Sequence, residues 1–235
     1  MKEISLKDII KWTRGEAHVS DANMEIGNIT TDSKDVKTNS LFVPRKGEFH
    51  DGHDFIPDFF KRGGKVSLTD HFISDYDIIV VKDTMQALRD IAKCHRDKFV
   101  LPIIGITGSV GKTSTRGMIS SVLATSGEVC ETEKNLNTEV GVPLTLMNIE
   151  KKHKAAVVEM GMRNLGEISY LTNIVKPDIA VITNIGTAHI ENLKNRENIL
   201  KAKMEILEGL PKNGLVILNG DDDLLWTKRR RCFIS

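Results

Sequence analysis

The sequence predicts an α/β protein with a small mixed α/β N-terminal domain and a second domain built on a truncated, mostly parallel sheet of the phosphate-loop type with flanking helices. Two observations lead to this prediction. A glycine-rich segment at 105–114 follows an apolar run and precedes a helical pattern, and further runs of valine and isoleucine recur beyond it. Continuous runs of this kind are typical of parallel strands that are buried on both faces.

The first 98 residues predict short strands that are joined by turns and followed by a helix. Apolar runs at 41–43 and 78–81 indicate strands, and Lys46-Gly47 and Asp51-Gly52 supply turn chemistry between them. Helical spacing follows at 83–98, with an apolar stripe formed by Met85, Leu88, Ile91, Ala92 and His95. After this helix, a stretch rich in acidic residues, glycine and histidine gives way to regularly spaced apolar strands. We therefore place a domain boundary near residue 98.

The second part repeats a unit of apolar strand, polar residue and helix. We expect strands at 155–158, 179–182 and 215–218. Ligands of parallel sheets bind at the carboxyl ends of the strands. The glycine-rich loop, Glu159, Asn184 and His189 are therefore expected along one edge, although the strand order does not follow from the sequence.

Charge and cysteine content limit the classes of partner. Lysine and arginine number 33 against 32 acidic residues, so the formal charge is +1 and favours neither nucleic acid nor an acidic membrane. No run approaches the roughly 20 apolar residues of a membrane span, and the N-terminus is too charged for a signal peptide. We therefore expect small-molecule partners, a cytoplasmic protein, and reduced thiols at the widely spaced Cys94, Cys130 and Cys232.

The glycine-rich segment has the features of a phosphate-binding loop. Gly108 and Gly111 allow backbone N–H groups to point inward, Lys112 adds positive charge, and Thr113 places a hydroxyl where Mg²⁺ would bind. The helix behind the loop is indicated by the spacing of Met118, Ile119, Val122 and Leu123. The strict Walker A pattern fails, because Ile106 stands where its first glycine belongs. The alternative is a glycine-rich strand-to-helix turn with an incidental lysine.

Glu159 and His189 are candidate metal ligands. An acid that ends a strand near a phosphate loop can supply the oxygen that Mg²⁺ prefers. The alternatives are a solvated glutamate at the turn formed by Met160-Gly161 and a histidine that only makes local hydrogen bonds.

Lys203 is the least ordinary residue of the helical segment expected at about 195–210. It falls near the centre of an apolar stripe, whereas Lys201 points to the opposite face. A lysine in this position must snorkel, pair with an acid, lose its proton or be modified. An unprotonated buried amine can take up CO₂ as a carbamate, which is a metal-binding anion. The stripe itself consists of Ile199, Leu200, Ile206, Leu207 and Leu210.

Taken together, these motifs resemble the Mur ligase family of peptidoglycan synthesis, from roughly residue 3 to Trp226. Six blocks occur in the family's order, and Thr138 stands where a further asparagine is common. The blocks are Thr31-Asp32-Ser33 with 41–47, Asp51-Gly52-His53-Asp54-Phe55, Gly108 to Thr113, Thr132 to Pro143, Glu159-Met160-Gly161 with 166–168, and Thr183 to Glu191.

The resemblance implies ATP-driven formation of an amide bond. Within the family, the sequence most resembles the ligase that joins D-alanyl-D-alanine to UDP-N-acetylmuramoyl-tripeptide. The carboxylate of the tripeptide would attack the γ-phosphate of ATP and form an acyl phosphate, and the amine of D-alanyl-D-alanine would then displace phosphate. Such a protein mainly positions the reacting groups and neutralises charge.

The resemblance also implies roles for individual residues. Thr113 would bind one Mg²⁺, Glu159 with His189 would bind a second, and Lys203 aligns with the lysine that is carbamylated in the family and then ligates metal. Lys112, Glu159, His189 and Lys203 would form the catalytic set. The nucleotide would contact Gly108, Ser109, Val110, Gly111, Lys112, Thr113, Ser114, Asn135 and Asn137, and the UDP-sugar would contact Ser33, Lys46, Gly47, Asp51 and His53.

Three regions are expected on this basis. Residues 1–98 would bind the UDP-sugar-peptide, residues 99–226 would form an incomplete central ATP-binding domain, and residues 227–235 would be a non-family tail added where a reading frame was disrupted. One alternative is a nucleotide- or UDP-sugar-binding fragment without ligase activity. Another is a related ligase such as folylpolyglutamate synthase, against which the Asp51-Gly52-His53 block argues.

Overall fold

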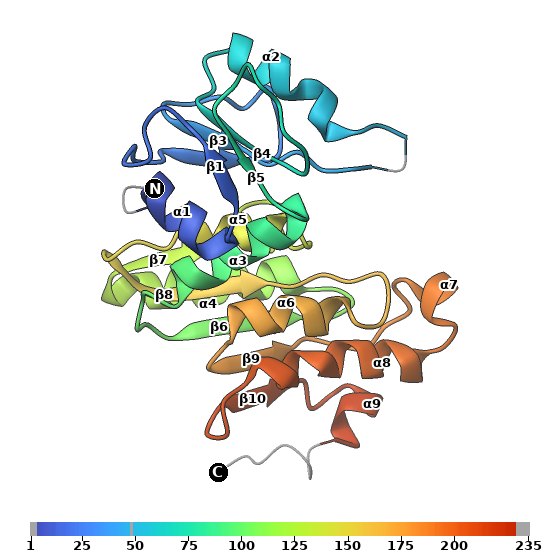
Figure 1. Cartoon of the computed structure of the whole chain (residues 1–235). Coiled ribbons are helices and arrows are strands. Elements are labelled where there is room, and N and C mark those ends of the chain that lie inside the picture. The colour runs from blue at the N-terminus through green and yellow to red at the C-terminus, as the bar shows by residue number, and fades with distance from the viewer. Residues whose placement is uncertain (1–3, 48, 229–235) are drawn as a thin grey trace. The chain divides into compact units, whose positions relative to one another are not determined.

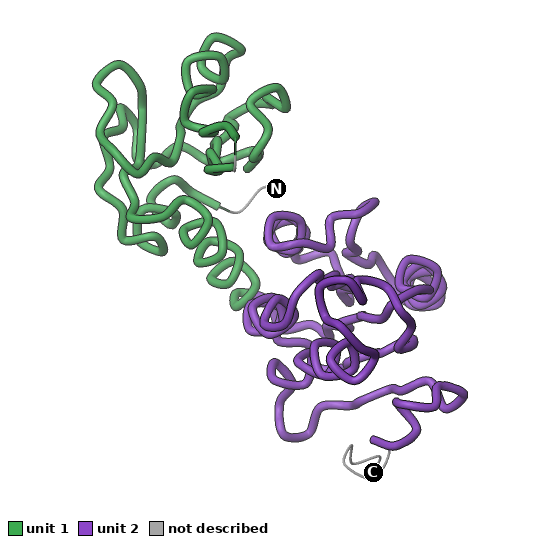
Figure 2. The backbone as a smooth tube through the Cα atoms, turned by 90° about the vertical axis from the view of Figure 1, so that its right-hand side faces the viewer, with its two compact units in different colours: residues 1–98 green, residues 99–235 purple. Residues whose placement is uncertain are grey.

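The computed structural model describes residues 4–47 and 49–228. The chain divides into two compact units, residues 1–98 and 99–235 (Figure 2). Each unit is built on its own five-stranded sheet with helices packed against it (Figure 1). The predicted α/β class is confirmed. None of the described helices is long and apolar enough to cross a membrane.

Unit 1 contains a mixed sheet with the order β1-β5-β4-β3-β2. Its strands run parallel except β1, which pairs antiparallel with β5. Helices α1 and α3 pack against each other. The elements are α1 (Leu6–Thr13), β1 (Glu16–His18), β2 (Asn28–Thr30), β3 (Ser40–Phe42), η1 (Gly52–Phe55), α2 (Ile56–Lys61), β4 (Val66–Thr69), β5 (Ile78–Val80) and α3 (Thr84–Arg96).

Unit 2 contains an entirely parallel sheet with the order β10-β9-β6-β8-β7. The strands are β6 (Ile103–Thr107), β7 (Glu128–Glu131), β8 (His153–Glu159), β9 (Ile179–Ile182) and β10 (Leu215–Leu218). The helices are α4 (Lys112–Leu123), η2 (Ala124–Ser126), α5 (Gly141–Met147), α6 (Glu167–Val175), α7 (Ile190–Leu193), α8 (Arg196–Met204), η3 (Glu205–Gly209) and α9 (Asp223–Trp226).

The strand order positions the candidate residues. The central strand β6 has β8 on one side and β9 on the other, so the segments that follow these three strands share one edge of the sheet. Helix α4 packs on β6, β7 and β8. It buries Ile119 and Leu123 against Ile104, Ile106 and Val157, which anchors the glycine-rich loop between β6 and α4.

Three predicted elements differ in detail from the expectation. The helix behind the loop is confirmed as α4, but Met118 and Val122 are 69% and 70% exposed because only the Ile119 side of the helix faces the sheet. Strand β10 is not buried on both faces: it forms one edge of the sheet (Figure 1), and its side chains alternate between exposed and half-buried. The helix expected at 195–210 is α-helical only to Met204 and continues as the 3₁₀ turn η3.

Candidate functional site

The loop between β6 and α4 depends on two glycines with positive φ. Gly108 has φ 150° and Gly111 has φ 82°, conformations that side chains other than glycine rarely adopt. A Cβ at Gly108 would also collide with Oγ1 of Thr183, which follows β9. The glycines therefore let the loop turn sharply and approach the neighbouring strand closely.

Two backbone amides of the loop point at one acceptor. The N–H groups of Ser109 and Val110 donate to Oδ1 of Asn184, at 3.1 and 3.0 Å. The hydroxyl of Thr183 donates to the carbonyl of Val110 at 2.6 Å, and the N–H of Gly186 donates to Oγ of Ser109 at 2.9 Å. Convergent N–H groups at a helix N-terminus form an arrangement that binds phosphate oxygens. A phosphate that used these two amides would take the place of the Asn184 carbonyl oxygen.

Lys112 begins α4 and folds back over the loop. Its Nζ donates to the carbonyls of Gly108 and Ser109, at 2.8 and 3.3 Å. Burial lowers the pKa of Lys112, and the attraction of Glu159 opposes that shift. A half-buried ammonium that is hydrogen-bonded to neutral carbonyls would gain strongly from an anionic partner.

Glu159 ends β8 as a buried acid, only 2% exposed, with a partner on each carboxylate oxygen. The hydroxyl of Thr113 donates to Oε2 at 3.0 Å, and the amide of Asn137 donates to Oε1 at 2.8 Å. Arg116 lies 3.5 Å from Oε2, and the N–H of Glu159 donates to the hydroxyl of Thr132 at 2.9 Å. A solvated glutamate at a turn does not fit this environment.

The donor atoms beside the loop fit Mg²⁺. The Glu159 carboxylate and the Thr113 hydroxyl are hard oxygen donors next to the proposed phosphate position, and Mg²⁺ is commonly bound by one or two carboxylates together with phosphate oxygens. His189, in contrast, is not hydrogen-bonded to this group of donor atoms in the described part of the chain. Its imidazole is exposed, and among the described residues it makes no hydrogen bond or ion pair with Glu159. A shared role for Glu159 and His189 thus stays a prediction.

Arg116 and Thr132 were missed by the sequence reasoning. Arg116 links three segments through Glu159, Glu131 and the carbonyl of Lys134. It stands four residues after Lys112 and three after Thr113, so helical spacing could have placed it on the same face of α4. Thr132 gives no such signal, because its contact depends on the pairing of β7 with β8.

Lys203 is buried on α8, with 2% of its surface exposed. Burial, reinforced by the charge of Lys112, lowers the pKa of its amine to about 7. In the described part of the chain no acid pairs with it, and its burial rules out snorkelling. Two of the four alternatives therefore fail for Lys203, and loss of its proton and covalent modification remain.

The free energy of unfolding is expected to depend on pH through Lys203. Below about pH 7 the folded protein must bury a charge, whereas between about 7 and the ordinary lysine value of 10.5 the unfolded chain binds a proton that the folded chain lacks. Stability should therefore rise with pH across this window, by up to about 1.4 kcal/mol per pH unit. Lys203→Met removes this pH dependence. The free energy of unfolding of the variant should therefore exceed that of the wild type by the largest amount below pH 7, and the difference should shrink towards pH 10.5.

Urea denaturation of both proteins in CO₂-free buffers at several pH values measures this difference. Lys201→Met, at an exposed position of the same helix, serves as the control. A difference between Lys203→Met and wild type that is independent of pH would show that Lys203 keeps its proton in the folded state.

Of the other three residues predicted to contact the nucleotide, Asn137 contacts Glu159, whereas Ser114 and Asn135 are exposed. Asn137 reaches Glu159, and Ser114 lies exposed on the first turn of α4. Asn135 is exposed, and its carbonyl accepts the N–H of Asn137 at 2.8 Å.

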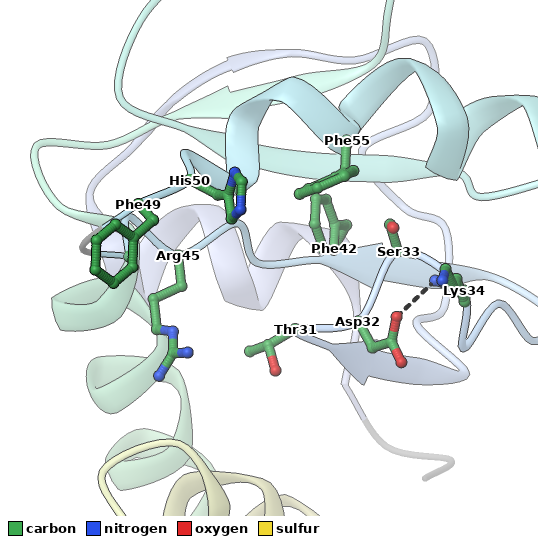
Figure 3. A pocket seen from close by; sticks show the side chains of 11 residues that line it. Thr31, Asp32, Ser33, Lys34, Phe42, Arg45, Phe49, His50 and Phe55 are labelled. Carbon is green, nitrogen blue, oxygen red and sulfur yellow. Dashed lines mark hydrogen bonds between the residues drawn. The ribbon is translucent and has the colours of Figure 1, made fainter.

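The residues expected to bind the UDP-sugar lie in or near a cavity of unit 1 of about 480 Å³. Ser33 and Gly47 line it, and Asp32 accepts the N–H of Lys34 at 2.9 Å, which orients the Ser33 turn (Figure 3). The lining also includes Phe42, Arg45 and Phe55, which lie in the two N-terminal sequence blocks, and Phe49 and His50, which lie between these blocks and were not predicted.

Lys46, Asp51 and His53 form a neighbouring ionic cluster instead of lining the cavity. Lys46 lies 2.5 Å from Oδ2 of Asp70, and Asp51 lies 2.5 Å from Nδ1 of His53. Hydrogen bonds from Lys46 and then from His71 lower the pKa of Asp70 to about 2.

Comparison with known proteins bears on the architecture of unit 2. The family model described as Mur ligase middle domain matches residues 106–232, which is more than half of the chain. The chain belongs to the Mur ligase family. The match includes the phosphate loop, Glu159, His189 and Lys203, and it extends into the segment 227–235 that we expected to lie outside the family. Residues 229–235 of that segment lie outside the described part of the structure.

Individual Mur ligases are similar over nearly the whole chain. The UDP-N-acetylmuramoyl-tripeptide–D-alanyl-D-alanine ligase of Bacillus subtilis is 38% identical over 226 residues, which cover 94% of this chain and 50% of the relative. The protein of the same name from Synechocystis is 42% identical over 213 residues, covering 89% and 47%. The chain thus spans about half the length of the Mur ligases it matches.

Solved Mur ligase structures share the fold. A crystal structure of MurF from Acinetobacter baumannii superimposes with a TM-score of 0.90 at 34% identity, covering 96% of this chain and 51% of that one. MurF ligase from Thermotoga maritima, in complex with ADP, gives a TM-score of 0.79 at 32% identity, covering 87% and 48%. The two-unit architecture is therefore that of the corresponding half of these Mur ligases.

Proposed function

We propose that the chain acts as a ligase that joins D-alanyl-D-alanine to UDP-N-acetylmuramoyl-tripeptide at the expense of ATP, with unit 1 binding the UDP-substrate and unit 2 binding the phosphates of ATP. The observation that carries this proposal is the buried Glu159, whose carboxylate accepts a hydrogen bond from the hydroxyl of Thr113 directly beside the phosphate loop. The names of the B. subtilis and Synechocystis relatives favour this substrate pair over the folate-type alternative.

The residues of unit 2 would act chiefly by positioning and by charge. Lys112 and the amides of 108–113 would hold the phosphates of ATP, and Thr113 and Glu159 would hold Mg²⁺. Bound Mg²⁺ supplies positive charge that stabilises the transferring phosphoryl group. Asn137 and Thr132 would keep the Glu159 carboxylate in place. Ser114 and Asn135 would contribute further nucleotide contacts.

Lys203 would complete the set as a carbamate. Its neutral amine can attack CO₂ at pH values near and above 7, which forms an N–C bond and releases a proton to solvent, and the product carries a negative charge. The carbamate would serve as a metal ligand together with His189, once the imidazole turns towards the site. The charge of Lys112 would then stabilise the modified residue instead of repelling it.

The substrate carboxylate would react as the resemblance implies. It attacks the γ-phosphate, ADP leaves, and the resulting acyl phosphate is attacked by the amine of D-alanyl-D-alanine with loss of phosphate. The cavity of unit 1 would hold the UDP portion, with aromatic rings for the uracil and the guanidinium of Arg45 for the diphosphate (Figure 3). Ser33 and Gly47 line this cavity, and Lys46, Asp51 and His53 would order the loop that borders it.

A second candidate is a binding fragment without ligase activity. It is favoured by the edge strand β10, which pairs only with β9 in the described part of the chain and exposes Leu215 and Ile217 by 41% and 47%. Native proteins usually protect apolar edge strands from solvent.

Phosphate release by the purified 235-residue chain separates the two candidates. With ATP, Mg²⁺, UDP-N-acetylmuramoyl-tripeptide and D-alanyl-D-alanine, the ligase proposal predicts phosphate release that requires all four components. Glu159→Gln should abolish it, and Glu191→Gln, at an exposed position, serves as the control. Absence of turnover together with retained UDP-sugar binding would overturn the ligase proposal for this chain and favour the binding fragment.

A further inference from the structure

A cluster of metal-binding side chains lies in unit 1, apart from the phosphate loop. It consists of His53 on η1 together with Asp70 and His71, which directly follow β4. One ligand atom from each residue can be chosen so that all three lie within 4.8 Å of one another. Two segments that are far apart in the sequence thus bring two imidazoles and a carboxylate together.

A single oxygen of Asp70 faces both imidazoles. Its Oδ1 lies 3.5 Å from Nε2 of His53 and 2.8 Å from Nδ1 of His71. Ligand atoms of a tetrahedral zinc site, with bonds of about 2.0–2.2 Å, lie roughly 3.3–3.6 Å apart. The distance between Asp70 and His53 therefore matches that of a metal site, whereas the exposed His71, at 2.8 Å from the same oxygen, would have to shift when a metal binds.

His53 is held in an orientation suited to a ligand. The side chain is buried, its Nδ1 lies 2.5 Å from Oδ1 of Asp51, and its Nε2 accepts the N–H of Asp70 at 3.4 Å. The tautomer with the proton on Nδ1 satisfies both contacts, and a metal on Nε2 would replace the N–H of Asp70 as the partner of its lone pair. A carboxylate behind the histidine is the usual support of a metal-binding imidazole.

Lys46 is the cation that opposes a metal at this position. Its ammonium lies 2.5 Å from Oδ2 of Asp70, the oxygen that does not face the imidazoles. Lys46 and a metal would therefore use different oxygens of the same carboxylate. The lysine side chain is 60% exposed and can move outward.

We propose that His53, Asp70 and His71 form a site for a divalent transition metal of the zinc type, which joins η1 to the segment that follows β4. Two imidazoles and one carboxylate suit Zn²⁺ and leave a fourth position for water, whereas Mg²⁺ and Ca²⁺ prefer oxygen ligands. The site does not depend on the proposed ligase function. It would stiffen the region next to the cavity, whose lining includes His50 and Gly52.

Calorimetric titration of ZnCl₂ into the metal-free full chain tests the proposal. We expect one Zn²⁺ per chain and a rise in melting temperature, because a ligand of the folded state stabilises it. His71→Ala should weaken binding at least about tenfold, while the control His50→Ala, another exposed histidine of the same unit, should bind as wild type does. Both substituted positions are exposed, so both variants should fold.

A third variant distinguishes a metal site from a purely structural ionic network. Lys46→Met removes the opposing cation and should tighten Zn²⁺ binding, and Co²⁺ should give the intense visible absorption of a four-coordinate site in wild type but not in His71→Ala. Failure to bind below about 100 µM Zn²⁺ would overturn the proposal. Equal affinities of wild type and His71→Ala, or equal losses in His71→Ala and His50→Ala, would overturn it too.

Discussion

Lys112→Ala is expected to weaken binding of ADP in the presence of Mg²⁺ by about 10- to 100-fold, since a charge-assisted contact to phosphate is worth about 1.5–3 kcal/mol. The Lys112 ammonium is half-buried, and within residues 4–47 and 49–228 it is bonded only to the carbonyls of Gly108 and Ser109. It is therefore positioned for an anion at the loop. Isothermal titration calorimetry measures the change.

The matched control is Lys201→Ala, which removes an exposed lysine of unit 2. It should bind ADP as wild type does, which separates a contact in the loop from a general effect of charge. If Lys112→Ala and wild type bound ADP equally well, the segment 108–113 would be a structural turn with an incidental lysine.

Lys203→Met is expected to eliminate a carbamate signal and to reduce the affinity for Mg²⁺-nucleotide. Wild-type protein that is equilibrated with ¹³C-labelled bicarbonate should show one carbamate carbonyl resonance above pH 7, because burial lowers the pKa of Lys203 to about 7 and so leaves much of its amine neutral there. The signal should decrease as the pH falls below 7.

The control for this experiment is Lys201→Met, which keeps Lys203 and should keep the resonance. In an otherwise complete ligase, Lys203→Ala should abolish Mg²⁺-dependent turnover, and short carboxylates should restore part of it. A labelled wild-type sample without a carbamate resonance would contradict the proposed modification and leave Lys203 as a neutral buried amine.

The parts of the fold that follow from local pattern were predictable. The strand before the loop, the two glycines and the start of α4 are encoded in consecutive residues, and the continuous apolar runs locate β8 and β9. The position of Lys203 on the apolar side of its helix was also predictable from helical spacing, whereas its full burial was not, because the pattern left snorkelling open. The sequence pattern predicted where these residues lie, but it did not by itself predict what each of them does.

Features that depend on strand order or on neighbouring segments could not be predicted. The exposure of β10 arises because it lies at the sheet edge, which an apolar run does not reveal. Strands β1 and β2 of unit 1 have three residues each, too few for a recognisable alternation. Phe49 and His50 line the cavity through the path of the loop, not through any periodicity.

The central claim is that unit 2 binds nucleotide phosphates at residues 108–113. Backbone amide chemical shifts, followed as Mg²⁺-ADP is added to the ¹⁵N-labelled chain, test it most directly. We expect saturable shifts at Ser109, Val110, Gly111 and Lys112, with a change in the Asn184 side-chain amide as the phosphate replaces its carbonyl oxygen. Unchanged shifts at these residues in millimolar ADP, or changes confined to unit 1, would contradict the claim.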